Sequence, residues 1–159
     1  MSWLQGSKPG RVAIALMLLT LGSGCKHWQN SEPRATARLL FERQHATIRV
    51  EIAASERARS QGLMHRKALA ADRGMLFVFA DEAVRGVWMK NTHIPLDVLF
   101  LSARGEIVSS LRHLSPCLSG TCEVYYSDVP ARYMLEVNAG FIDHWEIEPG
   151  DMVSWVGQR

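Results

Sequence analysis

The alternation of hydrophobic and polar residues along the chain predicts mostly short β-strands. Residues 47–53 alternate apolar and polar side chains, which is typical of a half-buried strand. Continuous apolar runs at residues 75–79 and 98–101 are too short for helices and predict central strands that are buried on both faces. Turn residues bound further predicted strands at residues 87–89, 107–111, 132–137 and 152–156.

Helical signals are few. Ser55 can cap a helix of about two turns, and Gly62 can supply the left-handed residue that ends it. About seven or eight short strands with one or two short helices predict a mainly β fold, either a compact closed barrel or a two-sheet sandwich. The length of 159 residues corresponds to about one domain.

The N-terminus departs from this pattern and resembles a secretory signal. Lys8 and Arg11 precede an apolar run at residues 12–21, and small residues follow this run. A run of about ten apolar residues is too short to span a bilayer, which needs about 20. The predicted organisation is an export signal (1–24), a polar tether (25–40) and a single β-rich domain (41–159).

Cys25 stands where a bacterial lipoprotein has its acylated cysteine, although Gly22 occupies a position where lipoboxes usually have leucine. An ordinary signal peptide that is cut nearby is the alternative. Three cysteines are an odd number for an oxidising compartment, and acylation of Cys25 would leave Cys117 and Cys122 as a disulfide pair. We therefore expect an extracytoplasmic protein of the bacterial cell envelope, with an N-terminal lipid anchor that makes the membrane its partner.

Charge and motif content argue against several function classes. The chain has 18 lysine and arginine residues and 16 acidic ones, and removal of Lys8 and Arg11 with the signal balances the two. No polybasic segment remains, so nucleic acid is not an expected partner. The sequence has no P-loop, dinucleotide-binding or Gly-x-Ser-x-Gly motif, and only His113 lies near the cysteine pair as a further zinc ligand. No cofactor and no metal are therefore expected.

A series of short motifs extends over most of the predicted domain. The most specific is Trp88-Met89-Lys90-Asn91-Thr92, which is followed by Pro95-Leu96-Asp97. The others are Gly62-Leu63-Met64 with Arg66, Gly74-Met75-Leu76-Phe77 with Phe79, Pro116-Cys117, Leu135-Glu136, Ala139-Gly140 and Gly150-Asp151. Together these motifs resemble the family known as domain of unknown function 192. The resemblance implies a compact β-rich fold that is often exported, and it implies no established reaction.

The candidate site is the connection within the longest of these motifs. If the strands at residues 87–89 and 98–101 pair as a hairpin, Lys90 and Asp97 lie opposite each other. They would form either an acid/base or ligand-clamping pair, or an ion pair that only fixes the strand register. Two roles are also possible for Trp88, Asn91 and Thr92. Each residue would either contact a ligand or serve only the structure.

Arg66 and Glu136 are the other charged residues within the motifs. They either join Lys90 in one polar concavity or pair with each other as part of the scaffold. Convergence of Arg66, Lys90, Asp97 and Glu136 on one cavity is therefore the observation that best discriminates between the functional hypotheses.

The leading hypothesis is an exported, membrane-tethered, non-catalytic module that binds a small polar ligand or an envelope protein around residues 90–97. One alternative is an enzyme that acts on an envelope saccharide or peptide, with Asp97 as general acid or base and Lys90 stabilising negative charge. A third hypothesis, a structural assembly partner, predicts a contiguous exposed apolar patch.

Overall fold

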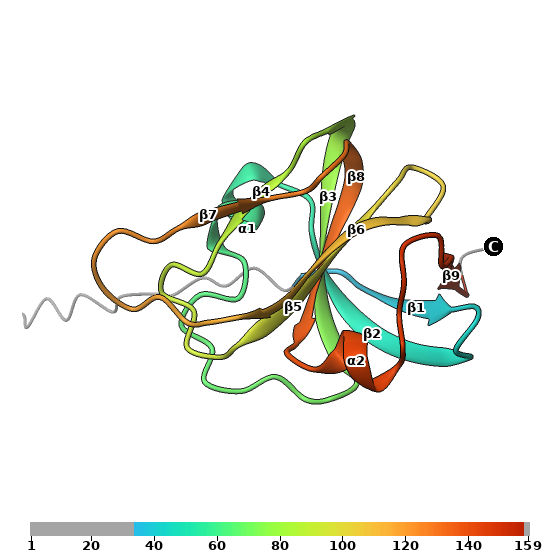
Figure 1. Ribbon diagram of the computed structural model, residues 1–159, viewed down its shortest axis with the longest axis horizontal. Coiled ribbons are helices and arrows are strands. Elements are labelled where there is room, and N and C mark those ends of the chain that lie inside the picture. Colours follow the sequence, from blue (N-terminus) through green and yellow to red (C-terminus); the bar gives the residue numbers. More distant parts are fainter. Residues whose placement is uncertain (1–33, 158–159) are drawn as a thin grey trace, which may run out of the picture. The chain divides into compact units, whose positions relative to one another are not determined.

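The computed structural model describes residues 34–157, so the predicted export signal, Cys25 and most of the predicted tether lie outside the described residues. The described part is mainly β, as predicted, with nine strands and two short helices (Figure 1). None of its helices has the length and apolar character needed to cross a membrane. The elements are β1 (Thr36–Phe41), β2 (Ala46–Ala53), α1 (Glu56–Gln61), β3 (Arg73–Ala83), β4 (Gly86–Trp88), β5 (Leu96–Leu101), β6 (Ile107–Leu114), β7 (Val124–Tyr126), β8 (Ala131–Asn138), α2 (Phe141–His144) and β9 (Val153–Val156).

Seven strands form one curled sheet in the order β6-β5-β8-β3-β2-β1-β9. The β2–β3 pair is parallel, and the other neighbouring strands are antiparallel. The two edges of the sheet meet at one end, where Glu106 and Met152 form an antiparallel bridge. The sheet is therefore a curled half-barrel, and β4 and β7 form a separate two-stranded sheet, here called the ribbon.

Strand β1 begins before the predicted end of the tether. Residues 36–40 were expected to belong to the tether, whereas Thr36–Phe41 pairs with both β2 and β9. Leu39 and Phe41 are fully buried. The intervening charged and polar residues obscure this alternation in the sequence, and the pairing partner β9 lies at the other end of the chain.

Helix α1 forms where the sequence predicts it. The Ser55 side chain accepts a hydrogen bond from the Ala58 N–H at 3.2 Å. Gly62 has a φ of +48° and donates its own N–H to the Ala58 carbonyl at 3.0 Å. The chain then turns back, so that Leu63 is buried against the sheet.

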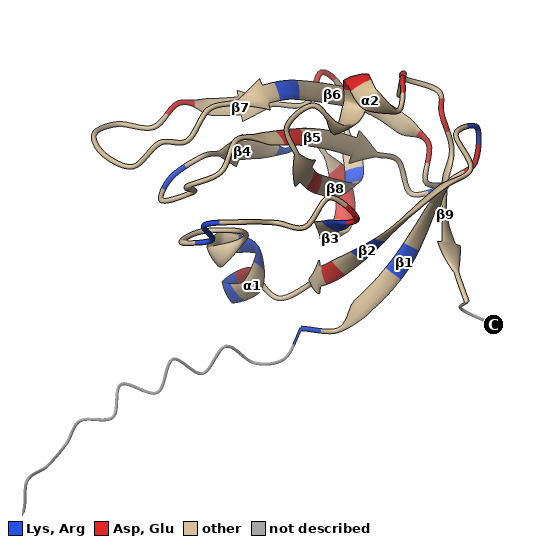
Figure 2. Ribbon diagram, turned by 90° about the horizontal axis from the view of Figure 1, so that it is seen from below, with Lys and Arg blue, Asp and Glu red and all other residues tan. Residues whose placement is uncertain are grey.

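The central strands bury side chains on both faces, so the sheet has a separate hydrophobic cluster on each side. Side chains of successive strand residues point to opposite faces. Two acidic residues of this framework, Asp97 on β5 and Glu136 on β8, are buried. Figure 2 marks the acidic positions of these strands in red. The first cluster, here called the barrel core, includes Leu39, Phe41, Leu76, Leu99 and Leu135, and the second, the ribbon-side core, includes Leu63, Met75, Phe77, Val98 and Met134.

Candidate functional site

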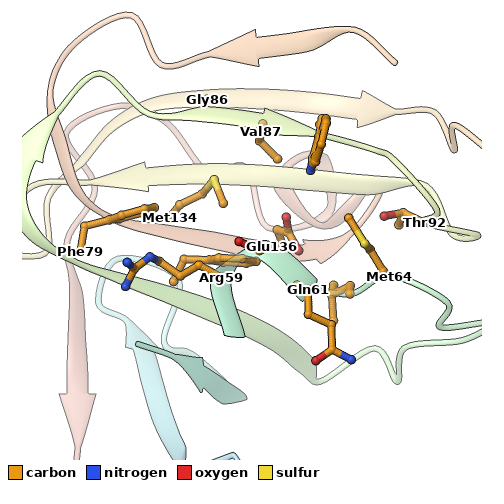
Figure 3. Close-up of a pocket in the computed structure, with 14 residues that line it drawn as sticks. Arg59, Gln61, Met64, Phe79, Gly86, Val87, Thr92, Met134 and Glu136 are labelled. Carbon is orange, nitrogen blue, oxygen red and sulfur yellow. The ribbon is translucent and has the colours of Figure 1, made fainter. Parts of the chain in front are cut away.

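A pocket of about 260 Å³ lies between α1 and β4 (Figure 3). Residues of β3 and β8 line it, together with α1, the residues that follow α1, and β4. We call it the α1–β4 groove. Its surface is mostly apolar at the base, where Phe77, Met134 and Leu63 belong to the ribbon-side core.

Glu136 is the acidic residue of this groove. It lies on β8 in register with Met75 on β3 and Val98 on β5, both of which belong to the ribbon-side core. Its side chain lies among the groove residues in Figure 3, and the residue is only 5% exposed. No hydrogen bond or ion pair joins its carboxyl group to another group of residues 34–157, and its oxygens are not among the fully buried atoms without a partner, so they reach the surface of the groove. Burial raises the pKa of Glu136 to about 8, because an apolar environment disfavours the charged form.

Two other residues of the predicted site also line the groove. Trp88 lies at its edge and is 45% exposed, and Thr92 is buried. The Lys90 ammonium lies 5.1 Å from the centre of the Trp88 ring, a distance at which a cation is attracted to the face of an aromatic ring. Lys90 is itself exposed and does not line the groove.

The strands at Trp88 and Asp97 do not pair as a hairpin, so the condition for placing Lys90 opposite Asp97 is not met. Strand β4 pairs with β7 in the ribbon, whereas β5 lies between β6 and β8 in the large sheet. All six residues of β5 are buried, so this strand occupies the interior of the sheet and cannot serve as the partner of an exposed ribbon strand. Lys90 and Asp97 form no ion pair within the described part of the chain.

Asp97 instead has a structural environment. It is fully buried and accepts hydrogen bonds from the backbone N–H of His113 at 2.8 Å and of Ile142 at 2.9 Å. It therefore links β5 to β6 and to the start of α2. Its register partner is Val137, which belongs to the barrel core, so Asp97 lies on the face of the sheet opposite to the groove.

Arg66 does not reach the groove. Its guanidinium lies 2.6 Å from a carboxylate oxygen of Glu51, and Arg34 contacts the same oxygen at 3.3 Å. The hydrogen bond from Arg66 is the main reason why the pKa of Glu51 is lowered. The four charged residues therefore do not converge on one cavity, because only Glu136 lines the groove.

Asn91 acts through its backbone. It has a left-handed conformation, with a φ of +54°. Its N–H donates to the carbonyl of Cys117 at 2.8 Å, and its carbonyl accepts from the N–H of His65 at 2.8 Å. Asn91 thus connects the segment after β4 to the segment after α1, the two sides of the groove.

The predicted disulfide joins Cys117 and Cys122. Cys117 also forms a parallel bridge with Lys90, and its N–H donates to the carbonyl of Met89 at 3.2 Å. The disulfide loop is therefore attached to the segment that follows β4. Within residues 34–157, no three His, Cys, Asp or Glu side chains are grouped as metal ligands.

Residues of α1 and β3, which were not among the predicted site residues, also line the groove. Arg59 of α1 donates to the carbonyl of Val78 at 3.0 Å and lies 5.3 Å from the ring centre of Phe79, and both Arg59 and Phe79 line the groove. Arg85 also lies over the Phe79 ring, at 4.0 Å. Gly62 could have indicated that the residues after α1 belong to the site, because it ends the helix and turns the chain back over the sheet.

Comparison with known proteins shows the family. The profile of domain of unknown function 192 (DUF192), described as "Uncharacterized ACR", matches residues 39–155. The chain belongs to the DUF192 family. The groove and Glu136 lie within the matched DUF192 residues.

Two solved structures resemble this DUF192 chain. A proposed transcription regulator from Sinorhizobium meliloti 1021 is 35% identical, with a TM-score of 0.69 over 79% of this chain and 97% of that chain. A protein of unknown function from Novosphingobium aromaticivorans DSM 12444 is 26% identical, with a TM-score of 0.68 over 77% of this chain and 85% of that chain. No match was found among curated proteins.

Proposed function

We propose that this protein is an exported, membrane-tethered binding module of the cell envelope whose α1–β4 groove holds a ligand with a positively charged group and an apolar body. The observation that carries the proposal is Glu136, a residue that is 5% exposed at a groove lined by both apolar and polar side chains and whose carboxyl group has no partner among the described residues.

A buried carboxyl group without a partner is costly for the folded protein. Ionisation of an isolated carboxylate in an apolar environment costs several kcal/mol. A bound cation would offset this cost, because it supplies both the opposite charge and hydrogen-bond donors. The groove residues Phe77 and Met134 would contact the apolar part of the same ligand.

The position of the other charged residues favours binding over acid/base catalysis. The alternative enzyme requires Asp97 and Lys90 to act together on one substrate. Asp97 faces the barrel core and is engaged by two backbone N–H groups, while Lys90 lies beside Trp88 at the surface. Glu136 is then the acidic group available to a molecule in the groove.

Export to the envelope is supported by the basic and apolar N-terminal segment and by the disulfide, since disulfides persist mainly in oxidising compartments. Intact-mass analysis of the protein purified from its native membrane tests the anchor. An N-terminal acylated Cys25 supports it, and a chain that begins at Met1 contradicts it.

Binding is tested with n-hexylammonium as the probe, followed by backbone amide shifts in NMR spectra at pH 8.5. We expect saturable shifts in the groove residues of the wild type and their loss in Glu136→Gln, which keeps the shape of the side chain but removes the charge. Glu42→Gln, at an exposed carboxylate in the β1–β2 turn, is the matched control and should bind like the wild type. Equal binding of n-hexanol, or unchanged binding by Glu136→Gln, would contradict the proposal.

A further inference from the structure

We propose that the ligand is an extended peptide segment, which adds a strand to the free edge of β4 and inserts a lysine side chain into the α1–β4 groove toward Glu136. This inference deepens the proposed function and rests on it. It combines two observations, the hydrogen bonding of β4 and the acceptor groups of the groove.

Within residues 34–157, one edge of β4 has no strand beside it. In the ribbon, Val87 pairs with Tyr125, and the Ser127 N–H donates to the carbonyl of Arg85 at 2.9 Å. Hydrogen-bonded and non-hydrogen-bonded residues alternate along an antiparallel pair, so Val87 is the next residue of β4 that bonds to β7. The N–H and C=O groups of the residues on either side of Val87 therefore point away from β7.

These residues are Gly86 and Trp88, and within residues 34–157 their backbone groups form no hydrogen bond outside the β4–β7 pair. All three residues of β4 line the groove, and Figure 3 shows Gly86 and Val87 across it from Arg59 and Gln61 of α1. Unpaired backbone groups along a strand edge are the template for strand addition by an extended peptide. The free edge of β4 thus provides two residues of backbone pairing at the groove.

The ribbon also offers apolar contacts to such a strand. Trp88, Val124 and Tyr126 share one face of the ribbon and are 45%, 41% and 60% exposed. Side chains of neighbouring strands that share a face contact each other. Outward side chains of an added strand would lie next to Trp88, and side chains on the face of Val87 would point toward the ribbon-side core.

The groove fits lysine better than arginine. The side chains that line it include two groups able to accept hydrogen bonds from a ligand, the carboxyl group of Glu136 and the hydroxyl group of Thr92. A lysine ammonium needs acceptors for three donors, whereas a guanidinium needs acceptors for five, so a lysine would leave fewer donors without partners. The apolar stem of lysine would contact Phe77 and Met134 on its way to the carboxyl group.

The test is a library of N-acetylated, C-amidated heptapeptides with a fixed central residue and mixed residues elsewhere, captured by the immobilised full-length protein at pH 8.5. We expect central lysine to be enriched at least about tenfold over central norleucine, which corresponds to about 1.4 kcal/mol. The enrichment should disappear with Glu136→Gln and persist with Glu42→Gln.

Backbone pairing is tested on the best lysine peptide by N-methylation of each amide in turn. Methylation should abolish binding at alternate positions only, because only one edge of an added strand faces β4. The amide signals of Gly86 and Trp88 should shift on binding.

The outcomes separate the two proposals. Absence of lysine enrichment, an equal preference for arginine, or tolerance of every N-methyl group overturns the peptide inference. If the peptide inference fails but n-hexylammonium still binds in a Glu136-dependent manner, the proposed function stands without the peptide inference. If neither probe binds, both proposals fail.

Discussion

Asp97 and Glu136 lie one register position apart on the paired strands β5 and β8, and their carboxyl groups face opposite sides of the sheet. Asp97 is opposite Val137 of the barrel core, and Glu136 is opposite Val98 of the ribbon-side core. Asp97 accepts two backbone hydrogen bonds, whereas Glu136 accepts none from residues 34–157. The same chemical group therefore has a structural role on one face and the proposed role in binding on the other, and the two roles can be tested separately.

Replacement of Glu136 with Gln should make the stability of the protein less dependent on pH. The folded state holds the Glu136 proton up to a pH of about 8, while an unfolded glutamate releases it near 4.3. Between these values the folded state binds more protons, so wild-type stability falls as the pH rises. Urea unfolding should show Glu136→Gln more stable than the wild type by about 2 kcal/mol or more at pH 8.5, with little difference at pH 4.5.

In the same comparison, Glu42→Gln should follow the wild-type pH profile, because this exposed side chain is not buried on folding. If the free energy of unfolding of the wild type changes with pH between 5 and 8 in the same way as that of Glu136→Gln, Glu136 is not buried in an apolar environment.

Affinity for an ammonium ligand should increase with pH. An ammonium group pairs with the ionised carboxylate, so binding requires Glu136 to lose its proton. Below the pKa of about 8, each pH unit should weaken binding about tenfold. Titration with n-hexylammonium at pH 6, 7 and 8.5 measures this trend, and a constant affinity would exclude Glu136 as the partner.

Replacement of Asp97 with Asn should destabilise the fold without altering the groove. An amide can accept only one of the two N–H groups and presents its own donor to the other, which costs about 2–3 kcal/mol. Denaturant unfolding measures the loss, and Asp72→Asn, at an exposed carboxylate, is the control. The folded Asp97→Asn protein should bind n-hexylammonium as the wild type does. If this variant loses binding but keeps the stability of the wild type, Asp97 takes part in the binding site.

Asp151 should make the fold sensitive to acid. It accepts hydrogen bonds from Arg43 at 2.6 and 2.8 Å and from the side chain of Gln44 at 2.8 Å. The bond from Arg43 is the main reason why the pKa of Asp151 lies well below its usual range. Its contribution to stability is present above about pH 4 and is lost as the pH falls further. In thermal unfolding, Asp151→Asn should be less stable than the wild type at pH 7, and the difference should shrink toward pH 2.

Removal of the disulfide should loosen the segment that follows β4. Replacement of both Cys117 and Cys122 with Ser should lower stability by about 2 kcal/mol, because the closed loop is small. Hydrogen exchange of the Asn91 amide, which donates to the Cys117 carbonyl, should become faster. Exchange of the Arg49 amide, which donates to the carbonyl of Asp72 just before β3, should be accelerated less. If removal of the disulfide accelerates hydrogen exchange equally at the Asn91 and Arg49 amides, the disulfide does not stabilise the segment after β4 locally.

The sequence predicted the elements that depend on neighbouring residues. The strand alternation of β2, the apolar run of β5 and the Ser55 and Gly62 ends of α1 are all local patterns, and each appears in the structure. Strand partners are not local. The Trp88 strand and β5 are close in sequence and a hairpin between them was open, but β4 pairs with β7 and β5 pairs with β8.

The candidate site was predicted only in part for the same reason. Trp88, Thr92 and Glu136 come together because β4 and β8 flank one groove, whereas Arg66 finds Glu51 nearby. The sequence placed Glu136 on the face of its strand opposite to Leu135 and Val137, but the absence of a charged partner becomes visible only when the neighbouring strands are known.

The side chains of β8 alternate between the two faces of the sheet, and this alternation affects how the domain can evolve. Leu135 and Val137 fill the barrel core, while Met134 and Glu136 face the other side. In a mutational scan of this strand, changes at Leu135, Val137 and the buried Met134 should reduce cellular abundance, and changes at Glu136 should chiefly alter binding to the proposed ligand. New specificities can therefore evolve on one side of a strand while the other side preserves the domain.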